Sequence, residues 1–419
     1  MSLSSATGVN IIGAGLAGSL LAILLARRGF KVAVYERRPD PRLAVANGGR
    51  SINLALAARG IRGLKLAGVL DRVMRFAIPM RGRMVHEHDG AAALQAYGVR
   101  PEEVIYSVAR GDLNRTLIEA AAELPNVEFH FGQLCLGLVH EKNVLEMRDE
   151  TTGRIYHIAA LPSIATDGAG SEVRESLLAR EVASVREEPL DHDYKELTIP
   201  AVDGKPALDV NALHIWPRGG FMLIALPNPD ATFTATLFLA RTGANSFEGL
   251  RSPQDVDAFF SREFPSAKAL MPDLAREFFE HPQGSLGTVY TKGWHLNGDV
   301  LLLGDAAHAI VPFHGQGMNC AFEDCAELDR LMDEHHNWAG LFEAFEHTRR
   351  PNTDAIAQMA LENYVEMRET VLDPEYRKKK AEAEELERKD PNFIPRYSMV
   401  MFHPEVPYGD ALRRTRANS

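Results

Sequence analysis

A glycine-rich turn and an acidic residue near the N-terminus have the spacing of a dinucleotide-binding site. Residues 13–18 read GAGLAG, and they follow a β-branched run at residues 9–12. An apolar stretch with helical spacing comes next, and a second strand-like run at residues 31–35 ends on Glu36. The glycines let the backbone approach a pyrophosphate, which the positive end of the helix attracts, and Glu36 can accept hydrogen bonds from a ribose. This order of elements predicts a bound dinucleotide.

A second polar element about 290 residues further on indicates which dinucleotide. Residues 299–303 form a buried-strand pattern that stops at Gly304 and Asp305, and residues 312–319 open a helix near Gly317. An aspartate at a strand end can hold a ribityl chain, and a helix N-terminus can face the pyrimidine edge of an isoalloxazine. A nicotinamide dehydrogenase has no need of this distant element. We therefore expect FAD.

A third element, residues 164–174, reads as a strand end, an Asp167-Gly168 turn and a helix start. Together the three motifs resemble the aromatic-hydroxylase class of flavoprotein monooxygenases. The resemblance implies an α/β fold: a Rossmann-like FAD-binding domain of the aromatic-hydroxylase type, a β-sheet substrate layer and a helical C-terminal region.

Further segments resemble the kynurenine 3-monooxygenase family over nearly the whole chain. They are residues 49–56 (GRSINLAL), 80–86 (MRGRMVH), 213–217 (LHIWP), 311–320 (VPFHGQGMNC), 359–367 (MALENYVEM) and 393–400 (FIPRYSMV). The family implies hydroxylation of L-kynurenine to 3-hydroxy-L-kynurenine with NADPH and O₂, through a C4a-hydroperoxyflavin. Because the flavin carries the chemistry, we assign no catalytic acid or base to the protein. No second G-x-G-x-x-G appears, so we expect NADPH to bind transiently.

The resemblance places the substrate contacts on Arg83, Tyr97, Asn363 and Tyr397, with Phe313 and His314 beside them. A guanidinium and tyrosine hydroxyls suit an amino-acid carboxylate, and an asparagine amide suits a zwitterion. Arg81 lies two residues from Arg83, and the sequence alone leaves open which of the two binds the carboxylate. The predicted FAD contacts are Gly13, Gly15, Leu16, Ala17, Gly18, Tyr35, Glu36, Arg37, Arg38, Ala55, Arg110, Cys135, Asp305, Gly317, Met318 and Asn319.

Two other functions stay open. One is a flavin hydroxylase of another anthranilate-like or phenolic aromatic acid. The other is a flavin-binding redox protein without turnover. Oxidation of NADPH with a panel of aromatic acids separates the three.

Composition excludes several classes. The chain has 419 residues, with 46 Lys and Arg against 57 Asp and Glu, which argues against nucleic-acid binding. Its three cysteines form no C-x-x-C pair, and no carboxylate or cysteine has the sequence spacing of a metal site around His308 or His314, so we expect no metal. The uncharged stretch at residues 7–26 has no basic residue before it and reads as buried core, not a signal anchor. With no apolar C-terminal segment, we expect a soluble, cytoplasmic, bacterial-type enzyme without a membrane anchor, and leave a homodimer possible.

We expect a discontinuous FAD-binding domain made of residues 1–75, 98–178 and 285–345. Residues 76–97 and 179–284 should form the substrate-binding sheet, and residues 346–419 a helical region that contributes to the substrate pocket. Within that region, the charge-dense run 374–390 reads as a solvated helix with ion pairs between successive turns.

Overall fold

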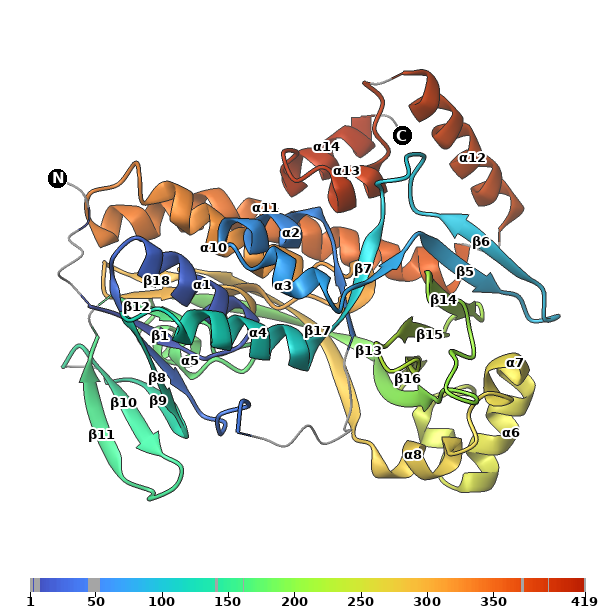
Figure 1. Ribbon diagram of the computed structural model, residues 1–419, viewed down its shortest axis with the longest axis horizontal. Coiled ribbons are helices and arrows are strands. Elements are labelled where there is room, and N and C mark those ends of the chain that lie inside the picture. Colours follow the sequence, from blue (N-terminus) through green and yellow to red (C-terminus); the bar gives the residue numbers. More distant parts are fainter. Residues whose placement is uncertain are drawn as a thin grey trace.

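The computed structural model describes residues 3, 8–43, 53–139, 142–160, 162–370, 373–390 and 392–417. Residues 49–52, the first half of one of the motifs singled out above, lie outside the described residues. Figure 1 shows the arrangement: one sheet with its helices on the left, a second sheet on the right, and helices of the C-terminal third across the top.

The first sheet has six strands in the order β18-β19-β12-β1-β2-β8. All neighbours are parallel except β18 and β19. Helix α1 leaves directly from the glycine turn after β1, and its apolar side chains are buried against the sheet. The strands are β1 (Gly8–Ile12), β2 (Lys31–Glu36), β8 (Val127–Phe131), β12 (Ser163–Ala165), β18 (His295–Leu296) and β19 (Val300–Leu302). The helices around them are α1 (Leu16–Arg27), α2 (Ala58–Leu66), α3 (Leu70–Met74), α4 (Arg110–Ala122), α5 (Glu172–Ala179), α9 (Asp305–His308) and α10 (Gly317–Leu331).

Two small sheets of three strands each flank this core. One has the order β11-β10-β9, and the other has the order β3-β7-β4. Their strands are β9 (Gln133–Val139), β10 (Val144–Asp149), β11 (Ile155–Ala159), β3 (Asn53–Leu56), β7 (Ile105–Ala109) and β4 (Ile78–Met80).

The second large sheet has seven strands in the order β17-β13-β16-β15-β14-β5-β6. Side chains alternate between its two faces, as in any pleated sheet. Leu223, for example, packs in the cluster with Phe259 and Phe260 of the covering helices, whereas its neighbour Met222 belongs to the cluster on the opposite face. The strands are β5 (Gly82–His86), β6 (Ala92–Ala96), β13 (Ser184–Ile199), β14 (Ala212–Pro217), β15 (Met222–Pro227), β16 (Phe233–Ala240) and β17 (Gln283–Lys292), and the covering elements are η1 (Phe247–Gly249), α6 (Pro253–Glu263), α7 (Pro265–Lys268) and α8 (Leu274–Glu280).

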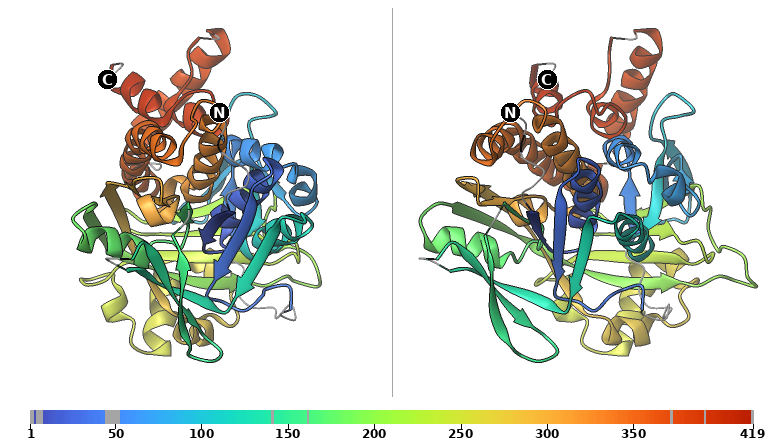
Figure 2. Two further views of the ribbon diagram at one scale, coloured as in Figure 1. Left: turned by 90° about the vertical axis from the view of Figure 1, so that its left-hand side faces the viewer. Right: turned by 60° about the vertical axis from the view of Figure 1, so that its left-hand side comes forward.

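The described elements that follow β19 are all helical, and they include the region 346–419 that was expected to be helical. Figure 2 shows these helices, orange to red, above the sheets, with α6 to α8 in yellow below them. None of the helices in the described ranges combines the length and the apolar character that crossing a membrane requires. The elements are η2 (Pro312–His314), α11 (Trp338–Arg368), α12 (Pro374–Lys389), α13 (Arg396–Phe402) and α14 (Tyr408–Ala417).

The sheet pairings can be set against the expected domain boundaries. Strands β5 and β6 lie in the seven-stranded sheet, whereas β4 pairs with β7 in a small sheet. Strand β17 pairs with β13 as far as Lys292, so the seven-stranded sheet continues past the expected boundary at residue 284. The reason is that β17 returns antiparallel along the long strand β13 from Ser184 to Lys195, a pairing that no local pattern in the sequence predicts.

Candidate active site

A cavity of about 530 Å³ lies between the two large sheets. On one side it is bounded by the segments that follow β1, β12 and β19, which are carboxyl ends of parallel strands in the six-stranded sheet. On the other side it is bounded by side chains of β13, β15 and β16. Ligands of open α/β sheets bind outside the carboxyl ends of the strands, and this cavity has that position.

The glycine turn after β1 has the shape that a pyrophosphate needs. A Cβ atom on Gly15 would meet nothing within 4 Å, so this backbone faces open space in the cavity. A Cβ atom on Gly18 would instead lie 2.0 Å from the Gly13 carbonyl oxygen and 2.5 Å from Thr166 Oγ1. Gly13 has a φ of 100°, and a Cβ atom there would lie 2.6 Å from the Thr166 carbonyl oxygen. The middle glycine thus leaves room for a ligand, and the other two let the helix, the strand and the loop pack closely.

Glu36 ends β2 beside this turn. Its Oε2 accepts a hydrogen bond of 2.8 Å from the Ala14 amide, and its Oε1 accepts one of 2.9 Å from the Arg38 amide. Tyr35 is half-buried and stacks on His130, with 4.7 Å between ring centroids. The carboxylate therefore lies at the strand end where a ribose would reach it, and it also braces the turn.

The far end of the cavity carries the second polar element. Asp305 and Arg110 both have side chains exposed to the cavity. The protein atoms that surround Asp305 at this end of the cavity desolvate its carboxyl group and raise its pKa. Helix α10 begins at Gly317, where a Cβ atom would again meet nothing within 4 Å. Open glycines at both ends of one cavity, with an aspartate beside the second, are the features that a long dinucleotide such as FAD requires.

The predicted FAD contacts fall into two groups. Eight of them line the cavity: Gly15, Leu16, Ala17, Ala55, Arg110, Asp305, Gly317 and Met318. The other eight lie outside its lining: Gly13, Gly18, Tyr35, Glu36, Arg37, Arg38, Cys135 and Asn319. Two of this second group are inner supports. The Asn319 amide donates hydrogen bonds of 2.8 Å to the carbonyls of Ala55 and Gly315, and Cys135 is buried in β9, where burial raises the pKa of its thiol to about 12.

Four of the six predicted substrate contacts form one cluster at the cavity wall. The guanidinium carbon of Arg83 lies 5.0 Å from the Tyr397 ring centroid and 5.8 Å from that of Tyr97. The two tyrosine rings stack at 5.6 Å, and His314 stacks on Tyr397 at 5.5 Å. All four side chains line the cavity. Arg81 is exposed, whereas Arg83 is buried, so the structure separates two arginines that the sequence could not.

Burial sets the protonation of this cluster. Burial disfavours the charge of Arg83, but Tyr397, Glu366 and Tyr97 outweigh it, so the pKa of the guanidinium is raised. Burial raises the pKa of Tyr97 and raises that of Tyr397 to about 12, which keeps both hydroxyls as donors. Burial lowers the pKa of His314 to about 4, and its Nδ1 is buried without a hydrogen-bond partner. The cluster therefore presents one fixed positive charge, two hydroxyls and a neutral imidazole.

The remaining two predicted contacts differ from each other. Phe313 lines the cavity between Phe238, at 5.0 Å, and Tyr364, which stacks on it at 3.8 Å. Asn363 does not line the cavity. Its Nδ2 donates a hydrogen bond of 2.7 Å to the Phe313 carbonyl, so the amide holds the loop from behind. The prediction that Asn363 contacts a zwitterion directly has no support in this arrangement.

Comparison with known proteins shows the family to which the chain belongs. The profile of the FAD binding domain family matches residues 6–360. The kynurenine 3-monooxygenase of Stenotrophomonas maltophilia is 49% identical over 97% of this chain and 90% of its own length. That of Myxococcus xanthus is 47% identical over 96% of this chain and 86% of its own. The chain belongs to the kynurenine 3-monooxygenase family. Its fold class and its class as an FAD-dependent monooxygenase, predicted from the sequence, are thereby confirmed.

Solved structures resemble the fold of this family member at low sequence identity. A tetrameric 2-methyl-3-hydroxypyridine-5-carboxylic acid oxygenase matches with a TM-score of 0.70 and 20% identity, over 97% of both chains. Pseudomonas aeruginosa PqsL, in complex with 2-aminobenzoylacetate, matches with a TM-score of 0.69 and 20% identity, over 86% of this chain and 96% of its own.

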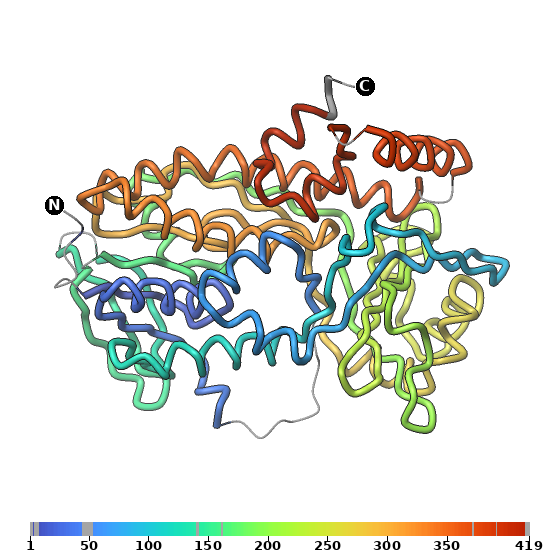
Figure 3. The backbone as a smooth tube through the Cα atoms, turned by 45° about the horizontal axis from the view of Figure 1, so that its top comes forward, coloured from blue at the N-terminus to red at the C-terminus, as the bar shows by residue number. Residues whose placement is uncertain are grey.

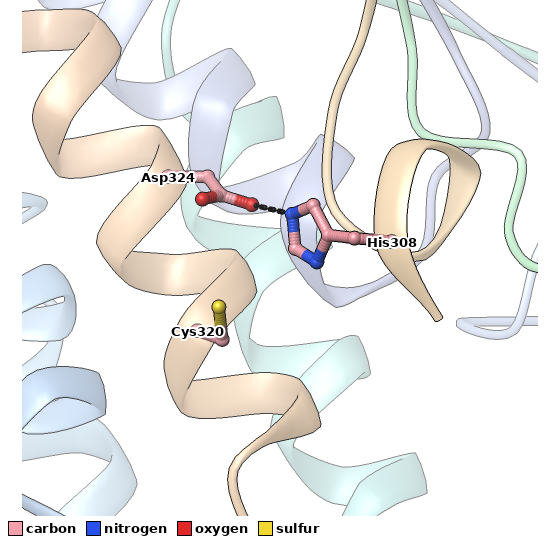
Figure 4. Close-up of side chains that lie close together, drawn as sticks. All are labelled: His308, Cys320 and Asp324. Carbon is pink, nitrogen blue, oxygen red and sulfur yellow. Dashed lines mark hydrogen bonds and ion pairs between the residues drawn. The ribbon is translucent and has the colours of Figure 1, made fainter. Parts of the chain in front are cut away.

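The tertiary structure of this member of the kynurenine 3-monooxygenase family brings together one cluster of side chains that are far apart in the sequence. His308, Cys320 and Asp324 bring their possible ligand atoms within 4.8 Å of one another (Figure 4). His308 Nε2 lies 2.7 Å from one oxygen of Asp324, and Arg349 Nε donates a hydrogen bond of 2.7 Å to the other. The sequence spacing around His308 gives no sign of this cluster, because α10 brings Cys320 and Asp324 back over the Gly304 turn. The guanidinium already supplies a cation to the carboxylate, and burial raises the pKa of the Cys320 thiol well above its usual value. The groups therefore form an ion network.

Sequence reasoning missed two kinds of residue at this family site. Glu366, whose Oε1 lies 3.3 Å from Arg83 Nη1, is part of the quoted segment 359–367 but was not singled out. The strands that carry Met222, Ile224 and Phe238 were expected in the substrate-binding sheet, but these three apolar wall residues were not singled out. Glu366 could have been found from its position one helical turn after Asn363, because residues three apart lie on the same face of a helix. The apolar wall could not have been found in this way, since the alternation of residues along a strand does not show which face of the sheet contacts a ligand.

Proposed function

We propose that the chain is a monooxygenase that converts L-kynurenine to 3-hydroxy-L-kynurenine with FAD, NADPH and O₂. The observation that carries this proposal is the cluster of Arg83, Tyr97, Tyr397 and His314 at the wall of an otherwise mostly apolar cavity. Such a site suits an amino acid with an aromatic ring. The names of the family relatives support the same substrate.

In this proposal Arg83 binds the substrate carboxylate, and the hydroxyls of Tyr97 and Tyr397 donate hydrogen bonds to it. A charge-assisted bond to a buried guanidinium is strong and directional, so it orients the rest of the molecule. Glu366 competes for Arg83 in the absence of substrate, because the two side chains are 3.3 Å apart. The orphaned Nδ1 of His314 is available to a polar group of the substrate.

The aromatic ring then lies against Phe313, Phe238 and the methionine and isoleucine of β15. FAD, when bound, supplies electron transfer from NADPH and activation of O₂. The amino group of kynurenine activates its own ring, so the protein side chains hold, orient and keep water away rather than transfer protons. His314 is neutral at physiological pH, which is consistent with a positioning role.

The deciding experiment measures NADPH oxidation by the purified flavoprotein with and without L-kynurenine, and identifies the product by mass. We expect oxidation to accelerate with kynurenine and the product to gain one oxygen atom. Faster turnover of a different aromatic acid would transfer the proposal to that substrate. If no aromatic acid of the panel stimulated NADPH oxidation, the conclusion would instead be that the chain is a flavin-binding redox protein without turnover.

A further inference from the structure

A second cavity of about 360 Å³ lies beneath α12, on the outer side of the substrate cluster. Helix α12 sits beside the β5–β6 hairpin, shown in red and light blue in Figure 3. Two contacts hold it there: Arg377 Nη2 pairs with Glu87 Oε1 at 2.7 Å, and Lys380 Nζ donates a hydrogen bond of 3.3 Å to the Ala96 carbonyl. From α12 the lining includes Tyr376, Lys379, Lys380, Ala383, Glu384 and Glu387.

The two cavities share a wall. Arg83, Tyr97 and Tyr397 line both of them. His314 and Met367 line only the inner cavity, whereas Glu366 and Tyr376 line only the outer one. These three side chains therefore stand between the two cavities. A rotation of those side chains would connect the two spaces, with no movement of a strand.

The outer cavity offers charges of both signs. Lys379 and Lys380 supply cations, and burial together with the nearby Arg83 lowers the pKa of Lys380. Glu366, Glu384 and Glu387 supply carboxylates. The Glu387 side chain is 1% exposed, and its Oε1 has no hydrogen-bond partner, although Arg100 Nη1 lies 3.5 Å away. A buried carboxylate oxygen without a donor is costly, and an ammonium group would satisfy it.

We propose that this outer cavity is a binding site for zwitterionic amino acids, through which substrate reaches the inner cavity. The carboxylate of the ligand meets the lysines of α12, and its ammonium group meets the glutamates. This inference rests on the proposed function for the identity of the amino acid that passes inward. It assigns α12 a role that a solvated helix with surface ion pairs would not have.

The test fills the outer cavity from α12. Ala383 lines it, and Ala381 of the same helix is exposed, so Ala383→Trp and Ala381→Trp form a matched pair. Stopped-flow mixing of the FAD-loaded protein with L-kynurenine follows the change in flavin absorbance. We expect Ala383→Trp to slow association and dissociation by about tenfold or more, with the dissociation constant nearly unchanged, because a blocked route affects both directions equally. Ala381→Trp should match the unmodified protein. If Ala383→Trp associates as fast as Ala381→Trp, the inference is overturned.

A second pair keeps the test decisive if the tryptophan disturbs folding. Lys380→Met should lower the association rate constant by about threefold to tenfold and weaken its dependence on salt, because a steering charge is lost. Lys378→Met, whose side chain is 77% exposed, should change neither. Equal effects of the two substitutions would contradict the inference. Failure of the proposed function is a separate outcome, seen as no hydroxylated product from the unmodified protein at any kynurenine concentration.

Discussion

At the scale of single residues, Arg83 is distinguished by what surrounds it. It is buried, contacts two tyrosine rings and lies on the wall between two cavities, whereas Arg81 is exposed two residues earlier. Both carry the same charge, so charge alone cannot tell them apart. Only the buried one can bind a carboxylate out of water, where the interaction is strong.

We therefore expect Arg83→Ala to raise the dissociation constant for L-kynurenine by about ten- to a hundredfold, since a lost charge-assisted bond costs about 1.5–3 kcal/mol. FAD should stay bound, and NADPH should be oxidised with more peroxide released, because a loosely held ring reacts poorly. Titration of flavin absorbance measures the affinity. Arg81→Ala is the control. A loss of kynurenine affinity in that variant alone would show that Arg81, and not Arg83, binds the substrate carboxylate.

His86 gives a prediction about pH. Its Nε2 lies 2.8 Å from His214 Nδ1, and its ring stacks on Trp216 at 4.2 Å. Burial, followed by His214 and Arg218, lowers the pKa of His86 from 6.5 to about 4. The folded state thus prefers neutral His86, so its stabilisation is complete above about pH 6.5 and is lost as the pH falls toward 4.

Urea unfolding between about pH 5 and pH 8 tests this. His86→Gln removes the titrating group and should flatten the fall in unfolding free energy toward the acidic end. His88→Gln, at an exposed position of the same hairpin, should keep the full pH dependence. If both variants follow the unmodified protein, His86 does not contribute to the acid sensitivity.

At the scale of elements, the turn between β1 and α1 needs glycine at two positions for two different reasons. The turn must leave space for a ligand at Gly15, and it must allow close packing at Gly18. These requirements predict different failures on substitution, although both positions belong to one motif.

Gly15→Val should fold, because its Cβ atom meets nothing within 4 Å, but it should lose FAD, because the side chain enters the space of the pyrophosphate. Gly18→Ala should instead lower the thermal unfolding midpoint of the apoprotein, because its Cβ atom would lie 2.0 Å from the Gly13 carbonyl. Flavin content and the unfolding midpoint of each variant separate the two effects. Retention of FAD by Gly15→Val would contradict the assignment of this turn.

At the scale of the whole molecule, a buried network joins the C-terminal helices to the helix that begins at Gly317. Arg59 of α2 is 1% exposed and pairs with Glu323 of α10, which also pairs with Arg349 of α11 at 2.8 Å. Arg59 also donates a hydrogen bond of 2.5 Å to the Val406 carbonyl, and its guanidinium carbon lies 3.9 Å from the Tyr408 ring centroid.

The same network reaches the end of the cavity. The Tyr408 hydroxyl donates a hydrogen bond of 2.7 Å to the side chain of Gln316, the residue before α10. The network therefore links α2, α10, α11 and α14 through charges and hydrogen bonds that are largely buried.

Arg59→Ala should lower the free energy of unfolding by about 3 kcal/mol, since it leaves a largely buried carboxylate with one partner fewer. It should also weaken FAD binding, because Gln316 loses the support of Tyr408. Chemical unfolding and flavin retention are the measurements. Arg62→Ala, at an exposed position of the same helix, should change neither, and equal behaviour of both variants would show that the network adds little stability.

The strands and turns that bind the dinucleotide are predictable from the sequence, because local patterns specify them. The glycine spacing, the acid at the end of β2 and the start of α10 at Gly317 depend on residues within a few positions of one another. The substrate cluster is different. Arg83, Tyr97, His314 and Tyr397 were found through resemblance to a family, since no local pattern connects a strand, a loop and two distant helical segments.

Contacts between segments far apart in the chain were decided only by the tertiary structure. It placed Asn363 behind Phe313, Glu366 beside Arg83, and Asp324 with Cys320 beside His308. It also divided the space around Arg83 into two cavities, and it extended the seven-stranded sheet through β17. The periodicity of apolar residues predicts which side chains are buried, but it does not predict which buried side chains contact one another. Those contacts depend on helix packing and strand pairing between segments hundreds of residues apart, which form only when the whole chain folds.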